Sequence, residues 1–218
     1  LGGVAEGTRP RLTPMHITYS PNVFVPLSTA CTEACAYCVF RFSNREHPVL
    51  PPEIVLRTLD QACRAGCTEA LFTHGQDPDH HPQVRSRLHA WGFQDMTTYL
   101  IWACEEALKR GLLPHVNPGV VNAHQLLRLK EVIASAGLML ETTAELPAHQ
   151  ASPSKTPAVR LSMLALAGRL RIPFTTGLLI GIGETWEDRV HALLEVRRLH
   201  ESYGHIQEII LQPVVPSR

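Results

Sequence analysis

The chain has 218 residues, 44% of them hydrophobic and 18% charged, and its 20 basic and 20 acidic side chains leave no formal net charge. This length predicts one domain with excursions, and the hydrophobic fraction excludes a disordered chain. No run reaches the roughly 18 apolar residues of a membrane span, and no basic run offers a surface for nucleic acid. We therefore predict neither membrane nor nucleic acid as a partner.

The predicted elements alternate between short apolar runs and longer helical patterns. In chain order, the runs that predict strands covered on both faces are Val23–Leu27, Glu69–Thr73, Leu112–Val116, Leu138–Thr142, Phe174–Ile180 and Gln207–Gln212. The helices predicted between them are Pro51–Ala65, Asp95–Arg110, Asn122–Ala136, Pro157–Arg171 and a last helix that starts in the capping sequence 185–188 and stops at Gly204. The predicted buried stripe of this last helix is Val190, Leu193, Leu194 and Leu199.

Six strand-then-helix units predict a parallel α/β sheet with right-handed crossovers. A doubly wound dinucleotide-binding sheet would show its glycine fingerprint after the first strand, where residues 28–38 hold cysteines instead. We therefore predict a partial (βα)6 TIM-like barrel, incomplete at its C-terminal end. Residues 1–14 are the predicted N-terminal lead-in and residues 15–218 the core domain. Chemistry in such barrels lies at the carboxyl ends of the strands.

Three cysteines within eight residues form the most specific motif. Cys31, Cys35 and Cys38 stand in a C-x3-C-x2-C pattern directly after the first predicted strand. Three thiolates in one loop can hold three irons of a [4Fe–4S] cluster and leave the fourth iron open for a small molecule. A structural zinc site would take four ligands, and no partner pair with zinc-finger spacing exists. Incidental cysteines are the remaining alternative.

The other cysteines bear on folding and compartment. The chain is long enough to fold without disulfides, so a reducing, cytoplasmic location is the predicted one. Cys63, Cys67 and Cys104 are predicted to pack in the core, because free cysteine is commonly buried.

The cysteine loop resembles the radical S-adenosylmethionine (SAM) superfamily, since the aromatic Tyr37 precedes the third cysteine after a first strand. Over nearly all of its length the chain is more specifically similar to the CofG-type subunit of 7,8-didemethyl-8-hydroxy-5-deazariboflavin (FO) synthase. The segments that carry this likeness are Ile17–Ser20, Val23–Leu27, Phe40-Arg41, His115–Gly119, Gly137–Glu141, Ser152–Lys155, Ile172–Gly177, Gly181–Thr185 and His205–Gln212.

The resemblance implies a [4Fe–4S] cluster and SAM as cofactors. In this superfamily the amino and carboxylate groups of SAM bind the open iron, and the reduced cluster cleaves SAM to methionine and a 5′-deoxyadenosyl radical. The implied substrate is an adduct of tyrosine with 5-amino-6-(D-ribitylamino)uracil, made by a companion CofH-type subunit or fused domain. The implied reaction is hydrogen abstraction, loss of ammonia, ring closure and oxidation to the deazaflavin FO, in coenzyme factor 420 biosynthesis. An electron donor is a further implied partner.

Two other classes of function stay open on the sequence. Another radical SAM activity, such as menaquinone-precursor or biotin-type chemistry, would use the same cysteine loop. A non-enzymatic Fe–S binding fragment or zinc module would have a filled coordination shell and no affinity for SAM. Since family members continue well beyond the last predicted strand, an inactive fragment is a third alternative.

The resemblance also implies roles for single residues at the strand ends. Tyr37 is expected beside the adenine of SAM, and Arg160 at its carboxylate, because guanidinium binds carboxylate through two parallel hydrogen bonds. Glu141 is expected to hold a ribose hydroxyl or the SAM amino group, and Asn117 to touch ribose or substrate. Each residue has an ordinary structural alternative, such as a half-buried ring, a helix-surface cation or a solvated carboxylate.

Backbone segments complete the expected SAM site. Ile180 and Gly181 belong to a segment that resembles the adenine-facing strand of the superfamily, where small residues let the backbone approach a flat ring. After the second strand, family members usually carry Gly-Glu-x-Pro, and this chain has Gly75-Gln76-Asp77-Pro78. The usual Glu accepts hydrogen bonds from the SAM ammonium, which Gln76 could do only without charge. The sequence therefore predicts that Gln76→Glu leaves SAM binding unchanged or tighter.

Overall fold

The structure, a computed structural model, describes residues 19–38, 40 and 47–215. The predicted lead-in, residues 1–14, lies outside the described residues, as do Ile17, Thr18 and Arg41 of the resembling segments.

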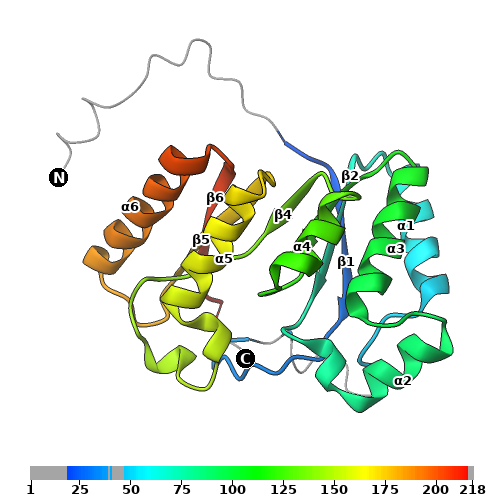
Figure 1. The fold of residues 1–218 in the computed structure, drawn as a ribbon, viewed down its shortest axis with the longest axis horizontal. Helices are drawn as coiled ribbons and strands as arrows, with labels where there is room; N and C mark the ends of the chain where they lie inside the picture. Colours follow the sequence, from blue (N-terminus) through cyan, green and yellow to red (C-terminus); the bar gives the residue numbers. More distant parts are fainter. Residues whose placement is uncertain (1–18, 39, 41–46, 216–218) are drawn as a thin grey trace, which may run out of the picture.

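Six strands form one sheet, as the sequence predicts. They are β1 (Asn22–Ser28), β2 (Glu69–His74), β3 (Leu113–Asn117), β4 (Ser135–Gly137), β5 (Phe174–Ile180) and β6 (Ile206–Pro213). They pair in chain order, and every neighbouring pair is parallel. Within the described residues β1 and β6 do not pair with each other, so the sheet is an open arc and not a closed barrel (Figure 1). The predicted TIM-like parallel arrangement is confirmed.

The helices lie in the crossovers between the strands. They are α1 (Pro52–Arg64), α2 (Pro82–Ala90), α3 (Met96–Lys109), α4 (Ala123–Lys130), α5 (Pro157–Arg169) and α6 (Trp186–Tyr203). Short 3-10 turns, η2 (Pro78–His80), η3 (Pro147–His149) and η4 (Pro153–Lys155), lie in the loops after β2 and β4. α2 is not among the predicted helices, because it buries few side chains, Val84 and Leu88. No helix of the described part is long and apolar enough to cross a membrane.

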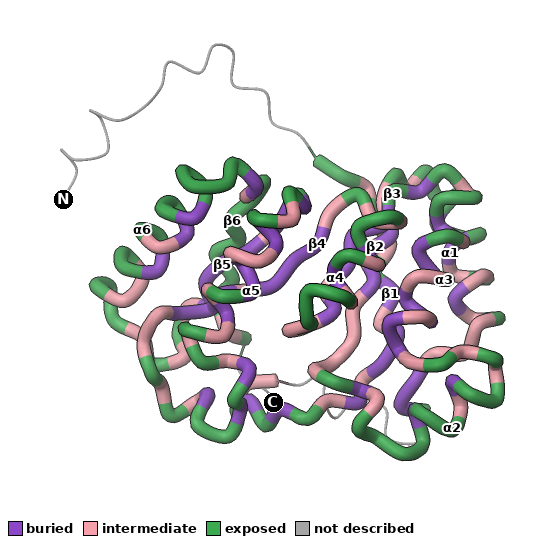
Figure 2. The backbone as a smooth tube through the Cα atoms, viewed as in Figure 1, coloured by how far each residue is buried: buried purple, intermediate pink, exposed green. Residues whose placement is uncertain are grey.

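The two faces of the sheet have different environments. Val25, Phe72, Val116 and Phe174 are completely buried in the hydrophobic core that the sheet shares with the helices. Figure 2 shows this buried layer along the strands and the exposed outer sides of the helices. Because successive strand residues point to opposite faces, neighbours such as His115 face the other side, where they line a cavity. The helices thus cover one face and leave the inner face to a site.

The fourth strand lies earlier in the chain than predicted. β4 ends at Gly137, whereas the prediction is 138–142, and the predicted helix 122–136 ends at Lys130. The run after β4 is buried, but its pairing is interrupted, because the Leu140 N–H donates to the Thr176 hydroxyl at 3.2 Å and not to a carbonyl. Glu141 then takes a left-handed backbone with φ of 70°, and it is joined to β5 only by an isolated bridge. The prediction of a regular strand at 138–142 is therefore wrong.

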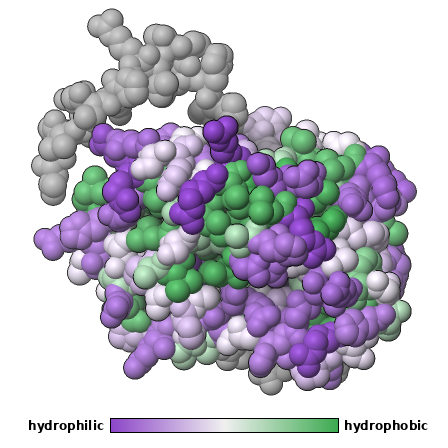
Figure 3. Space-filling view, in the orientation of Figure 1, coloured by the Kyte–Doolittle hydropathy of each residue, from purple (hydrophilic) through white to green (hydrophobic). Residues whose placement is uncertain are grey.

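The predicted start and stop signals of α6 are confirmed, but most of its predicted buried stripe is not. Thr185 caps the helix in a reciprocal box with Asp188, and Gly204 ends it in the left-handed conformation, φ 66°. The buried residues, however, are Ala192, Val196 and Leu199. Three of the four predicted stripe residues, Val190, Leu193 and Leu194, are exposed by 53%, 37% and 52%. The buried side chains at 192 and 196 are small or branched, and Figure 3 shows apolar surface among the polar side chains on the side of the molecule that carries the helices.

The cysteines outside the motif differ from one another in burial. Cys104 is fully buried in α3, as predicted, and Cys67 packs partly buried against the core. Cys63 is exposed on α1, where its thiol donates to the Arg110 carbonyl at 3.6 Å, so the prediction of core packing is wrong for this residue.

Candidate active site

A cavity of about 1010 Å³ follows the inner face of the sheet. At the carboxyl ends of the strands it brings together the three motif cysteines and most of the predicted SAM-site residues, which are Cys31, Cys35, Cys38, Tyr37, Gly75, Gln76, Asn117, Glu141 and Arg160. They come from the loops after β1, β2 and β4, from the end of β3 and from α5. The parallel topology is the reason, because the carboxyl ends of all six strands meet at one edge.

The loop after β5 stands apart from this group. Ile180 and Gly181 are not among the residues that line the cavity. The Ile180 carbonyl accepts the Val214 N–H at 2.8 Å, and the Gly181 N–H donates to the Glu184 carboxylate at 2.8 Å. Glu184 also pairs with Arg189, with 2.6 Å between the closest atoms. The role of Ile180 and Gly181 at the adenine stays a prediction.

The cysteine loop is fixed to two other loops. On one side the Gln76 N–H donates to the Cys31 sulfur at 3.1 Å. On the other side Ser152 Oγ lies 3.3 Å from the Cys35 sulfur and accepts the Ala34 N–H at 3.1 Å. Gly75 permits the first contact, because a Cβ there would lie 2.2 Å from the Ala30 carbonyl oxygen. The loop therefore depends on residues that follow β2 and β4.

The three thiols are free, with Cys35 buried and the other two partly exposed. Burial raises the pKa of Cys31, and the nearby charges of Cys35 and Cys38 raise it further. Three thiolates gathered here would thus be stabilised by a bound cation, and their soft sulfur donors suit an iron–sulfur cluster. No group of three or more His, Cys, Asp or Glu side chains in the described ranges is arranged as a ready metal site. The donor chemistry fits a cluster, and ligation requires the loop to adjust.

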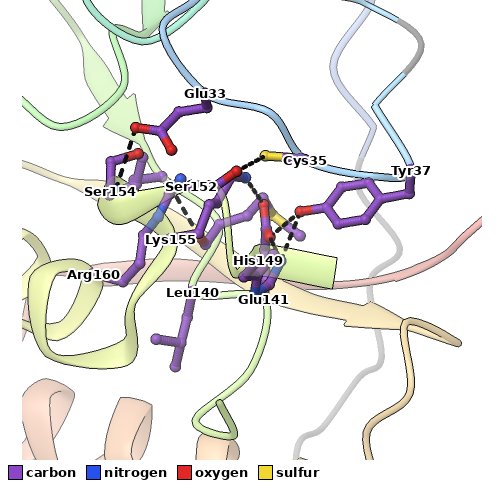
Figure 4. Close-up of polar contacts among 12 residues, drawn as sticks. Glu33, Cys35, Tyr37, Leu140, Glu141, His149, Ser152, Ser154, Lys155 and Arg160 are labelled. Carbon is purple, nitrogen blue, oxygen red and sulfur yellow. Dashed lines mark hydrogen bonds and ion pairs between the residues drawn. The ribbon is translucent and has the colours of Figure 1, made fainter. Parts of the chain in front are cut away.

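Glu141 is the centre of a buried polar network (Figure 4). Its carboxylate accepts hydrogen bonds from the Tyr37 hydroxyl and the Lys155 ammonium. His149 Nε2 lies 2.9 Å from both Glu141 Oε2 and Tyr37 Oη. The carboxylate belongs to a residue that is only 6% exposed and has a left-handed backbone, which a non-glycine residue keeps only where its surroundings impose it.

The network holds Glu141 in its charged form. Burial alone would raise the pKa of this carboxyl, but the hydrogen bond from His149 and the charges of Lys155 and Arg160 outweigh burial and lower the pKa to about 2. Burial and the Glu141 charge together raise the pKa of Tyr37, which therefore stays a neutral phenol. A charged acceptor and a neutral hydroxyl donor consequently stand side by side at the cavity wall.

Arg160 is a buried cation with unused hydrogen-bonding capacity. It is 4% exposed, and its Nη1 donates to the Met139 carbonyl at 3.3 Å. Its Nε has no hydrogen-bond partner in the described structure. Burial lowers the pKa of Arg160, while the negative charge of Glu141 opposes this shift. A carboxylate ligand at this position would satisfy the remaining N–H groups.

Sequence reasoning missed the partners that organise this site. His149, Ser152 and Lys155 all follow β4 and contact the cysteine loop or Glu141. Ser152 and Lys155 belong to a segment that carries the family resemblance, which is the signal that could have marked them. His149 lies outside every such segment, so only the fold brings it to Tyr37.

Gln76 has a structural pairing that the sequence did not predict, and its role at SAM stays a prediction. Its amide pairs twice with one backbone residue, because Nε2 donates to the Val120 carbonyl at 2.9 Å and Oε1 accepts the Val120 N–H at 2.8 Å. Gly119 leaves the space, since a Cβ there would lie 2.6 Å from Gln76 Oε1. The side chain thus joins the loop after β2 to the loop after β3, and its carbonyl already accepts a hydrogen bond.

This pairing reverses the expectation for a carboxylate at position 76. In Gln76→Glu, the side chain cannot donate to the Val120 carbonyl and places charge against it, so we expect a loss of about 1–2 kcal/mol in unfolding free energy. We also expect weaker SAM binding, because the same loop holds Cys31. Urea unfolding and equilibrium SAM binding measure both effects. Gln83→Glu, at an exposed position of α2, is the matched control, and equal behaviour of the two variants would contradict the pairing.

The open parallel arc, with three cysteines after its first strand and a cavity at the carboxyl ends, defines a radical SAM core. Residues 25–196 match the radical SAM superfamily, and the chain belongs to it.

Curated relatives give a more specific likeness. The chain is 54% identical over 200 residues to a 7,8-didemethyl-8-hydroxy-5-deazariboflavin synthase of Methanothermobacter thermautotrophicus, covering 90% of this chain and 61% of the relative. It is 49% identical over 205 residues to a protein of the same name from Methanoregula boonei, covering 94% of this chain and 62% of the relative. The chain thus spans about three fifths of the length of these relatives.

Solved structures show the same fold at low identity. Methylornithine synthase (PylB) superposes with a TM-score of 0.67 at 21% identity, covering 89% of this chain and 53% of that one. The FeFe-hydrogenase maturase HydG from Carboxydothermus hydrogenoformans gives 0.66 at 18% identity, covering 90% and 45%. Streptococcus suis SuiB bound to S-adenosylmethionine gives 0.61 at 15% identity, covering 91% and 42%.

Proposed function

We propose that this chain is the radical SAM core of an FO synthase of the CofG type. The observation that carries the proposal is the 54% identity to an FO synthase over 90% of the chain, which includes the cysteine loop and the Glu141 network. The proposed substrate is the tyrosine adduct of 5-amino-6-(D-ribitylamino)uracil, and the proposed product is FO.

Cys31, Cys35 and Cys38 are the proposed ligands of a [4Fe–4S] cluster, with SAM on the remaining iron. When bound, the reduced cluster and SAM supply the hydrogen abstraction that starts the reaction. Support comes from the superfamily match and from three free thiols that line one cavity. The cavity wall is formed by loops that are tied to one another, and this favours a site that excludes water during radical chemistry.

The other residues position SAM in this proposal. Arg160 binds the SAM carboxylate through its unpaired Nε–H and a second N–H of the guanidinium, in a bidentate geometry. The charged Glu141 accepts from a ribose hydroxyl or from the SAM ammonium, and Tyr37 places its ring against the adenine. Either role of Glu141 requires a ligand group to share the carboxylate with Lys155. Asn117 contacts ribose or substrate, and Ile180 and Gly181 approach the adenine edge.

The proposal includes partners. A companion CofH-type subunit or domain delivers the tyrosine adduct, and an electron donor reduces the cluster. A reducing compartment, the cytoplasm, keeps the six cysteines as free thiols.

An anaerobic assay tests the proposal. The protein is reconstituted with iron and sulfide, reduced, and given SAM with and without the tyrosine adduct, and 5′-deoxyadenosine and FO are quantified. Adduct-dependent FO is the expected result. Release of 5′-deoxyadenosine without FO would favour another radical SAM activity, such as menaquinone-precursor or biotin-type chemistry. Neither product at full iron content would overturn the proposal and favour a non-enzymatic Fe–S binding protein.

A further inference from the structure

The cavity extends from the cysteine loop to the amino-terminal ends of the strands, which lie at the top in Figure 1. At the amino-terminal ends of the strands it is lined by a group of polar residues, which we name the lower wall: Ser20, Glu69, His115, Ser135 and Glu208. They come from the segment before β1 and from β2, β3, β4 and β6. The distance along β3 from Asn117 at its carboxyl end to Leu113 at its amino end is four residue steps, or roughly 13 Å.

We propose that the lower wall binds an uncharged polyhydroxyl chain of the substrate and rejects its phosphate ester. The proposal rests on the proposed function, because it assigns the ribityl end of the adduct to the amino-terminal half of the cavity. It makes Glu69 and Glu208 specificity-determining residues.

Four residues of the lower wall, Ser20, Glu69, His115 and Ser135, form a chain of close polar contacts. Ser20 Oγ donates to Glu69 at 2.7 Å, and Glu69 Oε1 lies 3.8 Å from His115 Nδ1. The same His115 nitrogen lies 2.7 Å from Ser135 Oγ. Hydroxyl groups both donate and accept, so a polyol can donate to the carboxylates and bond with the serine and imidazole groups. Aliphatic or aromatic ligands would leave these polar groups unsatisfied.

A glycine leaves room for this arrangement on β4. A Cβ at Gly137 would lie 2.3 Å from Asn117 Oδ1 and 2.9 Å from His115 Nε2. The side chains of Asn117 and His115 therefore both lie close to Gly137, and all three residues line the cavity. This links the lower wall to Asn117, which the resemblance places near ribose or substrate, and gives one continuous polar surface along β3.

The distribution of charge along the cavity favours binding of a hydroxyl chain over a phosphate at the lower wall. Among the described residues that line the cavity, the Lys and Arg side chains are Lys155 and Arg160, and both lie at the upper rim beside Glu141. The lower wall, as defined above, has the carboxylates Glu69 and Glu208 and contains neither Lys nor Arg. Burial lowers the pKa of His115, while Glu69 and Glu208 act against this shift. A phosphate dianion would meet two carboxylates there, whereas a hydroxyl donates to them.

The test compares two fluorescent probes, FO and FO 5′-phosphate, on the reconstituted protein. We expect FO to bind at least tenfold more tightly than its phosphate. We expect Glu69→Gln and Glu208→Gln each to narrow this ratio severalfold, by weakening FO binding and relieving repulsion of the phosphate. Glu208 lies on the exposed strand β6, so its variant tests the proposal even where Glu69→Gln folds poorly. Glu195→Gln, on α6 and outside the cavity lining, is the matched control.

SAM affinity, measured on the same samples, separates this proposal from the proposed function. The assignment of the lower wall as a polyol subsite would be overturned by either of two results. One is equal affinity of the native protein for FO and FO 5′-phosphate, and the other is an affinity ratio that both variants leave unchanged. Adduct-dependent FO formation would then still stand. Normal SAM binding with no affinity for FO at all would overturn the polyol subsite and the FO assignment together.

Discussion

Replacing Cys35 with alanine should abolish SAM cleavage. Cys35, which lines the cavity, is the most buried of the three motif cysteines, 7% exposed, and its sulfur lies 3.3 Å from Ser152 Oγ. With two cysteines left in the loop, the proposed cluster loses one of three protein ligands, and we expect iron content and 5′-deoxyadenosine release to fall to background. Anaerobic reconstitution followed by iron analysis and product quantification measures both.

The control for this variant is Cys63→Ala. Cys63 is also a free thiol, but it is exposed on α1, away from the cavity lining. It should reconstitute and cleave SAM like the native protein. Undiminished 5′-deoxyadenosine release from Cys35→Ala would refute the cluster role of the motif, provided circular dichroism shows equal folding of both variants.

Replacing Glu141 with glutamine should destabilise the protein strongly and in a pH-dependent way. The substitution keeps the shape but removes the charge that Lys155 and Arg160 face in a buried setting. Breaking a buried ion pair from one side typically costs about 3–5 kcal/mol, because the remaining charge stays uncompensated. Urea unfolding at neutral pH measures the loss. Glu201→Gln, at an exposed position of α6, should change the unfolding free energy by less than about 0.5 kcal/mol.

The pH dependence follows from the lowered pKa of Glu141. In the folded protein this pKa is about 2, against an ordinary value of 4.5. The carboxylate thus contributes stability that is fully present above about pH 4.5 and is lost as the pH falls towards 2, roughly 3 kcal/mol in all. Native protein should lose this increment on acidification and Glu141→Gln should not. Glu184, whose pKa is also lowered to about 2, titrates in both proteins and cancels in the difference. Parallel pH profiles would contradict the buried network.

Most strands were predictable because they are continuous apolar runs between turn residues. β5 matches its predicted bounds, and β1, β2 and β3 are shifted by a residue or so at their ends. β4 was not predictable, because tertiary contacts decide it. Nothing local in 138–142 shows that Leu140 donates to a threonine side chain on β5, or that Glu141 takes a left-handed backbone. The Asn122–Ala136 helix was extended too far for the same reason, since its last residues pair with β3.

The candidate site was predictable where a short motif carries it. The cysteine spacing and the strand-end rule place Cys31, Tyr37 and Glu141 in one cavity, as the structure shows. The bonding of each side chain was not predictable. The sequence interpretation of Gln76 as a weak substitute for a ligand-binding carboxylate did not foresee its two hydrogen bonds with the backbone of Val120. Such pairings depend on loop-to-loop distances that no local pattern encodes.

The described sheet is weakly paired on both sides of β4, which pairs at only two positions with β3 and at two with β5, whereas β1 and β2 pair at six and β2 and β3 at five. We call the boundary between β3 and β4 the seam. The cysteine loop crosses this seam at the carboxyl ends of the strands. It follows β1, and its backbone N–H groups donate to Ala148 and Ser152, which follow β4. Amide hydrogens of β3 and β4 should therefore exchange through local opening of this seam, ahead of those in β1 and β2. A cluster bound by the cysteine loop would hold this loop more rigidly and slow amide exchange in β3 and β4 together. Deuterium uptake at the seam therefore reports how firmly the cysteine loop is held.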